Sequence, residues 1–173
     1  MPGLVLDRRH LISVAGVVFG TALAWGGLAL FRPGPAAGPA PAAEGLAIAA
    51  GLLVWPALLL LLMVLTVALA RFATAAFDPL KDPESRFQRR AQRALSNSVE
   101  QTAIFVPAML SAAALAAPGD IRLAGVVTGL FCVSRLLFWV GYLIHPYLRA
   151  PGMIMTLNVN AAIVGYALYQ VLG

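Results

Sequence analysis

Long apolar stretches separated by short polar ones dominate the pattern along the chain. Five of them approach or exceed the length that crosses a bilayer as a helix, about 20 residues. They cover approximately residues 11–31, 45–77, 91–117, 121–148 and 151–172. Pro56 lies inside the second stretch, where we expect a kink. The pattern predicts an all-α integral membrane protein with five spans.

A segment rich in proline and alanine, residues 32–44, follows the first span. It cannot be helical throughout, because proline lacks the backbone N–H that a helix interior uses. We therefore divide the chain into a transmembrane anchor helix at residues 1–31, this linker, and a four-helix bundle at residues 45–173. The linker is expected to tie the first span outside the bundle.

Composition supports a membrane protein and excludes several kinds of site. The 173 residues are 61% hydrophobic and 11% charged, whereas soluble domains are about half apolar and a quarter charged. The formal net charge is +5, but loop cations set topology in membrane proteins, so we expect no nucleic-acid partner. Cys132 is the one cysteine and lies in an apolar run, which excludes an intrachain disulfide and a cysteine metal cluster. We expect no metal.

Basic residues gather in alternate loops and so predict an orientation. Arg8 and Arg9 precede the first span, a cluster occupies residues 78–90, and Arg149 lies in residues 146–150. By the positive-inside rule, the amino terminus and these two loops face the cytoplasm of a bacterial inner membrane, and the carboxyl terminus faces out. The two arginines also match a twin-arginine export signal, although the length of the apolar run favours a retained anchor.

A polar stripe enters the third span. Its members recur at steps of four, three, four and three, which places them within about 80° of one helix face. They are Arg86, Arg90, Arg93, Asn97 and Glu100. Polar side chains carried into a membrane helix are costly unless they bind something or each other.

A second stripe follows the fourth span at the same kind of spacing and consists of Arg135, Phe138, Tyr142, His145 and Arg149. Arg135 is 14 residues before Arg149, about 21 Å along a helix axis, and therefore lies deep in the hydrocarbon layer. Glu100 is the one acidic residue in a predicted span. We predict that Arg135 and Glu100 pair, directly or through a polar ligand.

The stripes allow two interpretations. In the first they are structural, and a buried ion pair joins two helices. In the second they line a cytoplasm-facing pocket for a small anionic ligand, since guanidinium groups donate paired hydrogen bonds to carboxylates and stay charged. Asn158 and Asn160 point in different directions on the last span, so we expect them to make helix–helix hydrogen bonds.

The third span resembles the signature of the MAPEG family, the membrane-associated proteins in eicosanoid and glutathione metabolism. Arg93, Asn97 and Glu100 match its Arg-Ala pattern, with Asn four residues after the Arg and Glu three further on. Arg135, Tyr142 and Arg149 are seven apart, similar to the leukotriene C4 synthase branch. The resemblance covers about residues 45–173. It implies a MAPEG-like four-helix bundle, assembled as a homotrimer, with one additional N-terminal transmembrane helix.

The resemblance also implies a cofactor and roles for these residues. Glutathione would lie between subunits, held by Arg93, Asn97, Glu100 and Tyr142, with Arg90 beside them and Arg135 in the same binding set. Arg149 would be catalytic, because an adjacent guanidinium lowers the pKa of a thiol from about 8.5 and favours the thiolate nucleophile. Phe138 stands where some members have a tyrosine that contacts glutathione.

Two functions follow as hypotheses. The first is a glutathione-dependent membrane transferase or peroxidase that acts on lipophilic electrophiles or lipid hydroperoxides. The alternative is a non-catalytic subunit with the same fold that binds lipid or serves as a scaffold, with a membrane-protein partner docking on residues 11–31. A proton-coupled transporter using Glu100 is disfavoured, because the sequence lacks inverted repeats and broken helices.

Overall fold

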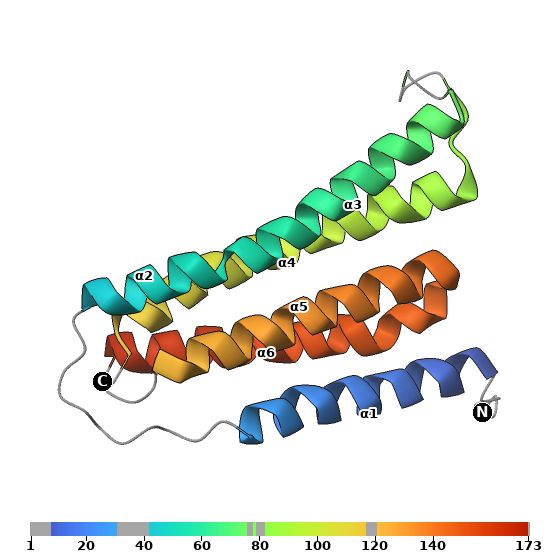
Figure 1. Cartoon of the computed structure of the whole chain (residues 1–173). Helices are drawn as coiled ribbons and strands as arrows, with labels where there is room; N and C mark the ends of the chain where they lie inside the picture. The colour runs from blue at the N-terminus through green and yellow to red at the C-terminus, as the bar shows by residue number, and fades with distance from the viewer. Residues whose placement is uncertain (1–7, 31–41, 76–77, 79–81, 117–120, 173) are drawn as a thin grey trace.

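The computed structural model describes residues 8–30, 42–75, 78, 82–116 and 121–172 (Figure 1). All regular structure in these residues is helical, which confirms the all-α prediction. The elements are α1 (Arg8–Ala29), α2 (Ala42–Leu52), α3 (Val54–Ala73), α4 (Arg86–Ala114), α5 (Ile121–Ile144), the short 3-10 helix η1 (Pro146–Arg149) and α6 (Ala150–Leu172).

Within these described residues, four stretches of helix are long and apolar enough to cross a membrane: Leu11–Ala29, Ala42–Ala73, Arg122–Ile144 and Pro146–Leu172. The protein is therefore an integral membrane protein. The remaining predicted span, α4, has 29 residues, about 44 Å of helix, but the polar stripe occupies its first half. The first half of α4 can lie in the hydrocarbon layer only where protein or a ligand covers its polar side chains.

Two antiparallel layers and one outer helix make up the arrangement. Figure 1 shows α2 and α3 in line and antiparallel to α4, with α5 and α6 as a second antiparallel pair and α1 on the outer side of that pair. The start of α1, the end of α3, the start of α4 and the end of α5, which η1 follows, lie at one end. These are the regions that carry the basic clusters, so the structure gathers them on one side, as the positive-inside rule requires. Which side faces the cytoplasm stays a prediction.

A break separates α2 from α3 close to the proline that predicted a kink. Leu53 joins the two helices, and Pro56 lies in the first turn of α3. Proline is tolerated in a first turn but would lose a hydrogen bond in a helix interior, so the break falls just before it. Residues 31–41, most of the predicted linker, lie outside the described residues, and α2 begins at Ala42, inside the last part of that linker.

The core combines apolar packing with polar bonds between helices. Phe105 of α4 stacks on Phe131 of α5 with ring centroids 4.1 Å apart. One turn along α4, Gln101 accepts a hydrogen bond through its Oε1 from Asn160 Nδ2 of α6, at 3.0 Å. This confirms the helix–helix bond predicted for Asn160. Buried polar groups need such partners, because no water is present inside a membrane bundle to form hydrogen bonds with them.

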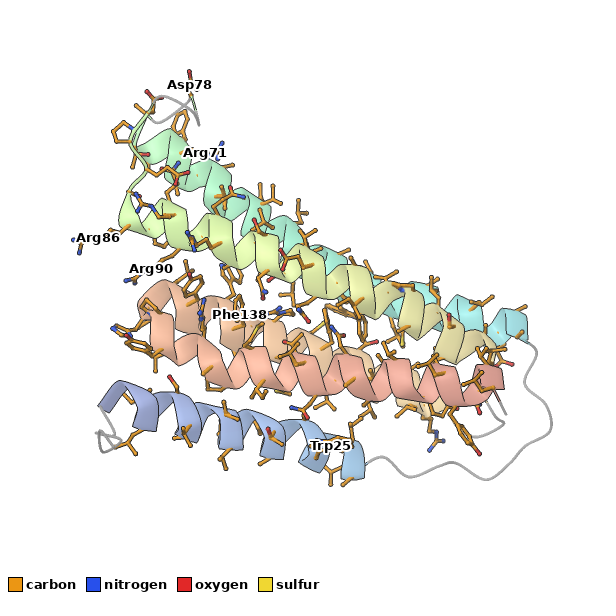
Figure 2. The ribbon with its side chains drawn as sticks, turned by 180° about the vertical axis from the view of Figure 1, so that it is seen from behind. Trp25, Arg71, Asp78, Arg86, Arg90 and Phe138 are labelled. Atoms are coloured by element: carbon orange, nitrogen blue, oxygen red, sulfur yellow. The ribbon has the colours of Figure 1, made fainter. Side chains whose placement is uncertain are left out.

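The first helix packs on its own chain instead of lying apart from it. Gly16, Gly20 and Ala24 follow one face of α1, and Ala24 is fully buried. A Cβ atom at Gly20 would overlap the backbone oxygen of Pro151, so only glycine allows the two helices to come this close. Trp25 Nε1 donates to Asn158 Oδ1 at 3.0 Å (Figure 2), which is the second helix–helix bond the sequence led us to expect.

Candidate functional site

Most of the predicted site residues line one depression. It has a volume of about 310 Å³ and is lined by Arg93, Ser96, Asn97, Glu100, Phe138, Tyr142, Arg149 and Met153. Four elements contribute to it: α4, α5, η1 and α6. Five of the seven residues predicted for the site, Arg93, Asn97, Glu100, Tyr142 and Arg149, are thus brought together by the fold.

The start of α4 determines which of its residues face the depression. Ser85 caps the helix and accepts a hydrogen bond from the backbone N–H of Gln88 at 3.1 Å. From there, the residues Ala91, Ala94, Ser98 and Gln101 are buried against the other helices. The polar stripe consequently turns outward: Arg93 and Glu100 are exposed on the subunit, and Asn97 is half-buried.

A sharp reversal after α5 places Arg149 above the same depression. His145 is extended, its ring nitrogen accepts from the backbone N–H of Tyr147, and Pro146 begins η1. The chain then returns far enough for the Arg149 guanidinium carbon to lie 5.0 Å from the centroid of the Tyr142 ring. A guanidinium over an aromatic face is held there by the ring quadrupole, and its donors remain available to a ligand.

The first turn of α6 closes the depression from the side. Gly152 lies directly against α5, where a Cβ atom would overlap the backbone nitrogen of Phe138. This close approach brings Met153 beside the buried cluster of Ala94, Phe138 and Tyr142. Figure 2 shows Phe138 between α4 and α5. The floor of the depression is therefore apolar, and the charges surround it.

Arg135 lies behind this floor. It is 2% exposed, its Nη1 donates to Asn97 Oδ1 at 3.2 Å, and its guanidinium carbon lies 4.2 Å from the Phe138 ring centroid. The predicted direct pair with Glu100 is wrong within this subunit, because Asn97 takes that place and Glu100 is rotated about 60° around α4 toward the outside. A pair bridged by a ligand stays a prediction, and Arg135 Nε and Nη2 are buried with no hydrogen-bond partner.

Arg90 has a different place from the one predicted. Its Nη1 donates to the backbone oxygens of Leu143 at 3.2 Å and Ile144 at 3.1 Å, the last carbonyls of α5. The charge thereby caps the negative end of that helix. Arg90 is not among the residues that line the depression.

Two lining residues were not predicted. Ser96 precedes Asn97 in the chain, and its hydroxyl donates to the backbone oxygen of Gln92, so its neighbour in the sequence was a usable signal. Met153 comes from α6, and no pattern in the sequence distinguishes it from other apolar residues of that helix.

Comparison with known proteins decides the family. A model of the MAPEG family matches residues 46–169, which is more than two thirds of the chain. The chain belongs to the MAPEG family. The match begins inside α2, so α1 lies before the part of this MAPEG protein that the family model covers. No curated protein matches the chain.

MAPEG proteins generally use glutathione, and the donor set of this one suits that ligand. Glutathione carries two carboxylates, one ammonium group and a thiol. Arg93 and Arg149 offer two guanidinium groups, Glu100 offers one carboxylate, and Asn97 supplies an amide in the same depression. The charges that line the depression are therefore opposite in sign to those of the ligand's acidic and ammonium groups.

Proposed function

We propose that this MAPEG protein is a glutathione-dependent membrane transferase or peroxidase acting on lipophilic electrophiles or lipid hydroperoxides. The observation that carries the proposal is the single depression where Arg93, Asn97, Glu100, Tyr142 and Arg149 meet. Among the described residues, no group of three His, Cys, Asp or Glu side chains is placed to hold a metal ion.

Each side chain has a role that follows from its charge and position. Arg93 and Asn97 bind carboxylate and amide groups of the peptide, and Glu100 binds its ammonium group. Glutathione, when bound, supplies the nucleophilic sulfur. Arg149 favours the thiolate over the thiol by placing a permanent positive charge beside it, and Tyr142 holds that guanidinium through its ring.

Assembly as a homotrimer would place this depression at a seam between subunits. Glu100 is exposed on the subunit and lies 14 residues beyond Arg86, about 21 Å along α4. A carboxylate facing hydrocarbon at that depth costs several kcal/mol. A second copy packed against this face of α4 would remove the cost and complete the wall of the depression.

The test of the function measures the thiolate directly. Purified protein in detergent is titrated with glutathione while the ultraviolet thiolate band is recorded, and binding is measured separately by calorimetry. We expect Arg149→Ala to retain binding through Arg93 and Asn97 but to lose the thiolate band at least tenfold. Arg122→Ala is the matched control, because Arg122 is exposed at the opposite end of α5.

Two results would refute the proposal: a thiolate band unchanged in Arg149→Ala, or binding with neither a thiolate band nor turnover over a broad panel of electrophiles and hydroperoxides. The second result would favour the non-catalytic alternative. A first helix free to act as a docking element would favour that alternative, and the contacts between α1 and α6 occupy one face of this helix.

A further inference from the structure

The first helix is held in a defined position on α6. Along its inner face, a Cβ atom at Gly16 would lie 2.9 Å from Pro151 Cδ, and one at Gly20 would overlap the Pro151 backbone oxygen. Ala24 is fully buried, and Trp25 is bonded to Asn158. Close packing and a hydrogen bond at membrane depth together keep α1 in place.

Beside this contact, α1, η1 and α6 line a second cavity that is partly open to the surface, which we call the α1 chamber. Its volume is about 390 Å³, and its lining residues are Ser13, Val17, Pro146, Tyr147, Arg149, Ala150, Met153 and Ile154. Aliphatic side chains and proline form most of the wall, and Arg149 is its one charged member. The size and the mostly apolar wall with a few polar groups are typical of small-molecule sites.

The α1 chamber and the polar depression meet at Arg149 and Met153, which line both cavities. One guanidinium thus stands between a polar cavity with charges that suit a peptide and an apolar cavity walled by a membrane helix. A reactive atom that enters the chamber reaches the same arginine as a thiol bound in the depression. Bringing two reactants to one group is how a site gains from proximity.

We propose that the α1 chamber receives the apolar chain of the second substrate, with its electrophilic end at Arg149. This inference rests on the proposed function. It specifies a substrate with one unbranched chain and a terminal electrophile whose oxygen can accept a hydrogen bond from the guanidinium, as in a long-chain 2-alkenal. A membrane phospholipid is the competing occupant, but its phosphate would take Arg149 and leave a bound thiol without its guanidinium.

The first experiment varies chain length. Conjugation of glutathione to a 2-alkenal forms a C–S bond at C3, converts the C=C bond to a single bond as C2 gains the proton lost by the thiol, and releases no second product. Loss of enal absorbance therefore follows the reaction. For chains of about six to about twelve carbons, we expect KM to fall roughly two- to fourfold per added CH2 group in the native protein. Val17→Trp fills the chamber and should abolish this trend without weakening glutathione binding.

Matched variants show whether the chamber itself is responsible. Val18 is 65% exposed and is not a lining residue, so Val18→Trp should keep the trend. Ser13→Phe fills the chamber from one turn earlier on α1 and should repeat the effect of Val17→Trp if that variant misfolds. Turnover with an unchanged chain-length trend in both filled variants overturns the inference and leaves the proposed function standing.

The second experiment needs no turnover. A long-chain fatty alcohol with a diazirine on the chain is photolysed with the protein, and the labelled residues are mapped by mass spectrometry. We expect labels at residues 13–17 and 146–154, reduced at least tenfold in Val17→Trp and unaffected by glutathione.

The remaining outcomes are each decisive. Labelling only at residues that face the bilayer overturns the chamber as a binding site. Phosphatidylcholine vesicles that abolish both labelling and the thiolate band of bound glutathione overturn the inference in favour of a lipid occupant. Chamber labelling without conjugation of any alkenal overturns the assignment of the chamber to the second substrate and leaves the proposed function standing, because other electrophiles and hydroperoxides test that function separately.

Discussion

The hydrogen bond between Asn97 and Arg135 offers the sharpest test of how this bundle tolerates a buried charge. Among the described residues, Asn97 Oδ1 is the acceptor for Arg135 Nη1, while Nε and Nη2 are buried without a partner. Asn97→Leu therefore leaves a guanidinium that is 2% exposed with no hydrogen bond at all, facing only the Phe138 ring.

The size of the effect follows from the charge. A hydrogen bond to a charged group contributes about 1.5–3 kcal/mol, so we expect Asn97→Leu to lower the free energy of unfolding by about 2 kcal/mol. In a chain of this size that lowers Tm by roughly 4–8 °C. Arg135→Met removes the charge and keeps an apolar chain, which costs little or stabilises, because the desolvated guanidinium is no longer present.

The double variant distinguishes coupling from additivity. Asn97→Leu with Arg135→Met should unfold within about 0.5 kcal/mol of Arg135→Met alone, giving a coupling energy of about 2 kcal/mol. The measurement is thermal denaturation in one detergent without glutathione, so that the predicted ligand role of Asn97 does not contribute. Ser96→Ala, one residue earlier, is the control. Strictly additive shifts would show that another group neutralises Arg135, and the reasoning would fail.

Two further predictions concern residues outside the depression. Arg90→Met removes the cap on Leu143 and Ile144, so it should lower the free energy of unfolding by about 0.5–2 kcal/mol and leave the affinity for glutathione unchanged. A loss of glutathione affinity above threefold would instead show that Arg90 belongs to the binding set. Gly20→Val forces α1 away from the Pro151 backbone, so it should lower the free energy of unfolding by about 1–3 kcal/mol, measured by thermal denaturation. Gly26→Val is the control, because a Cβ atom there meets nothing within 4 Å. Equal effects of the two substitutions would contradict the close contact.

Periodicity and composition alone were enough for the local structure. Apolar stretches of span length predicted the helices, and Pro56 predicted the break that falls at Leu53. The steps of three and four predicted that Arg93, Asn97 and Glu100 share a face, because a helix repeats every 3.6 residues whatever surrounds it. The seven-residue spacing of Arg135, Tyr142 and Arg149 predicted one continuous helix face only in part. Arg149 lies in η1, after a reversal of the chain that spacing cannot predict.

What the tertiary structure decided are the choices among partners. The sequence shows that Arg135 needs a polar partner, but Asn97 and Glu100 are both candidates on one helix, and only the rotation of α4 against α5 selects Asn97. Likewise, the spacing of Arg90 places it in the polar stripe of α4, but its hydrogen bonds go to the last carbonyls of α5. Nothing in the sequence around the glycines of α1 indicates which helix they contact, and their close packing on α6 depends on Pro151, which is far along the chain. Helical faces are local consequences of backbone geometry, whereas pairing between faces depends on how all the helices pack at once.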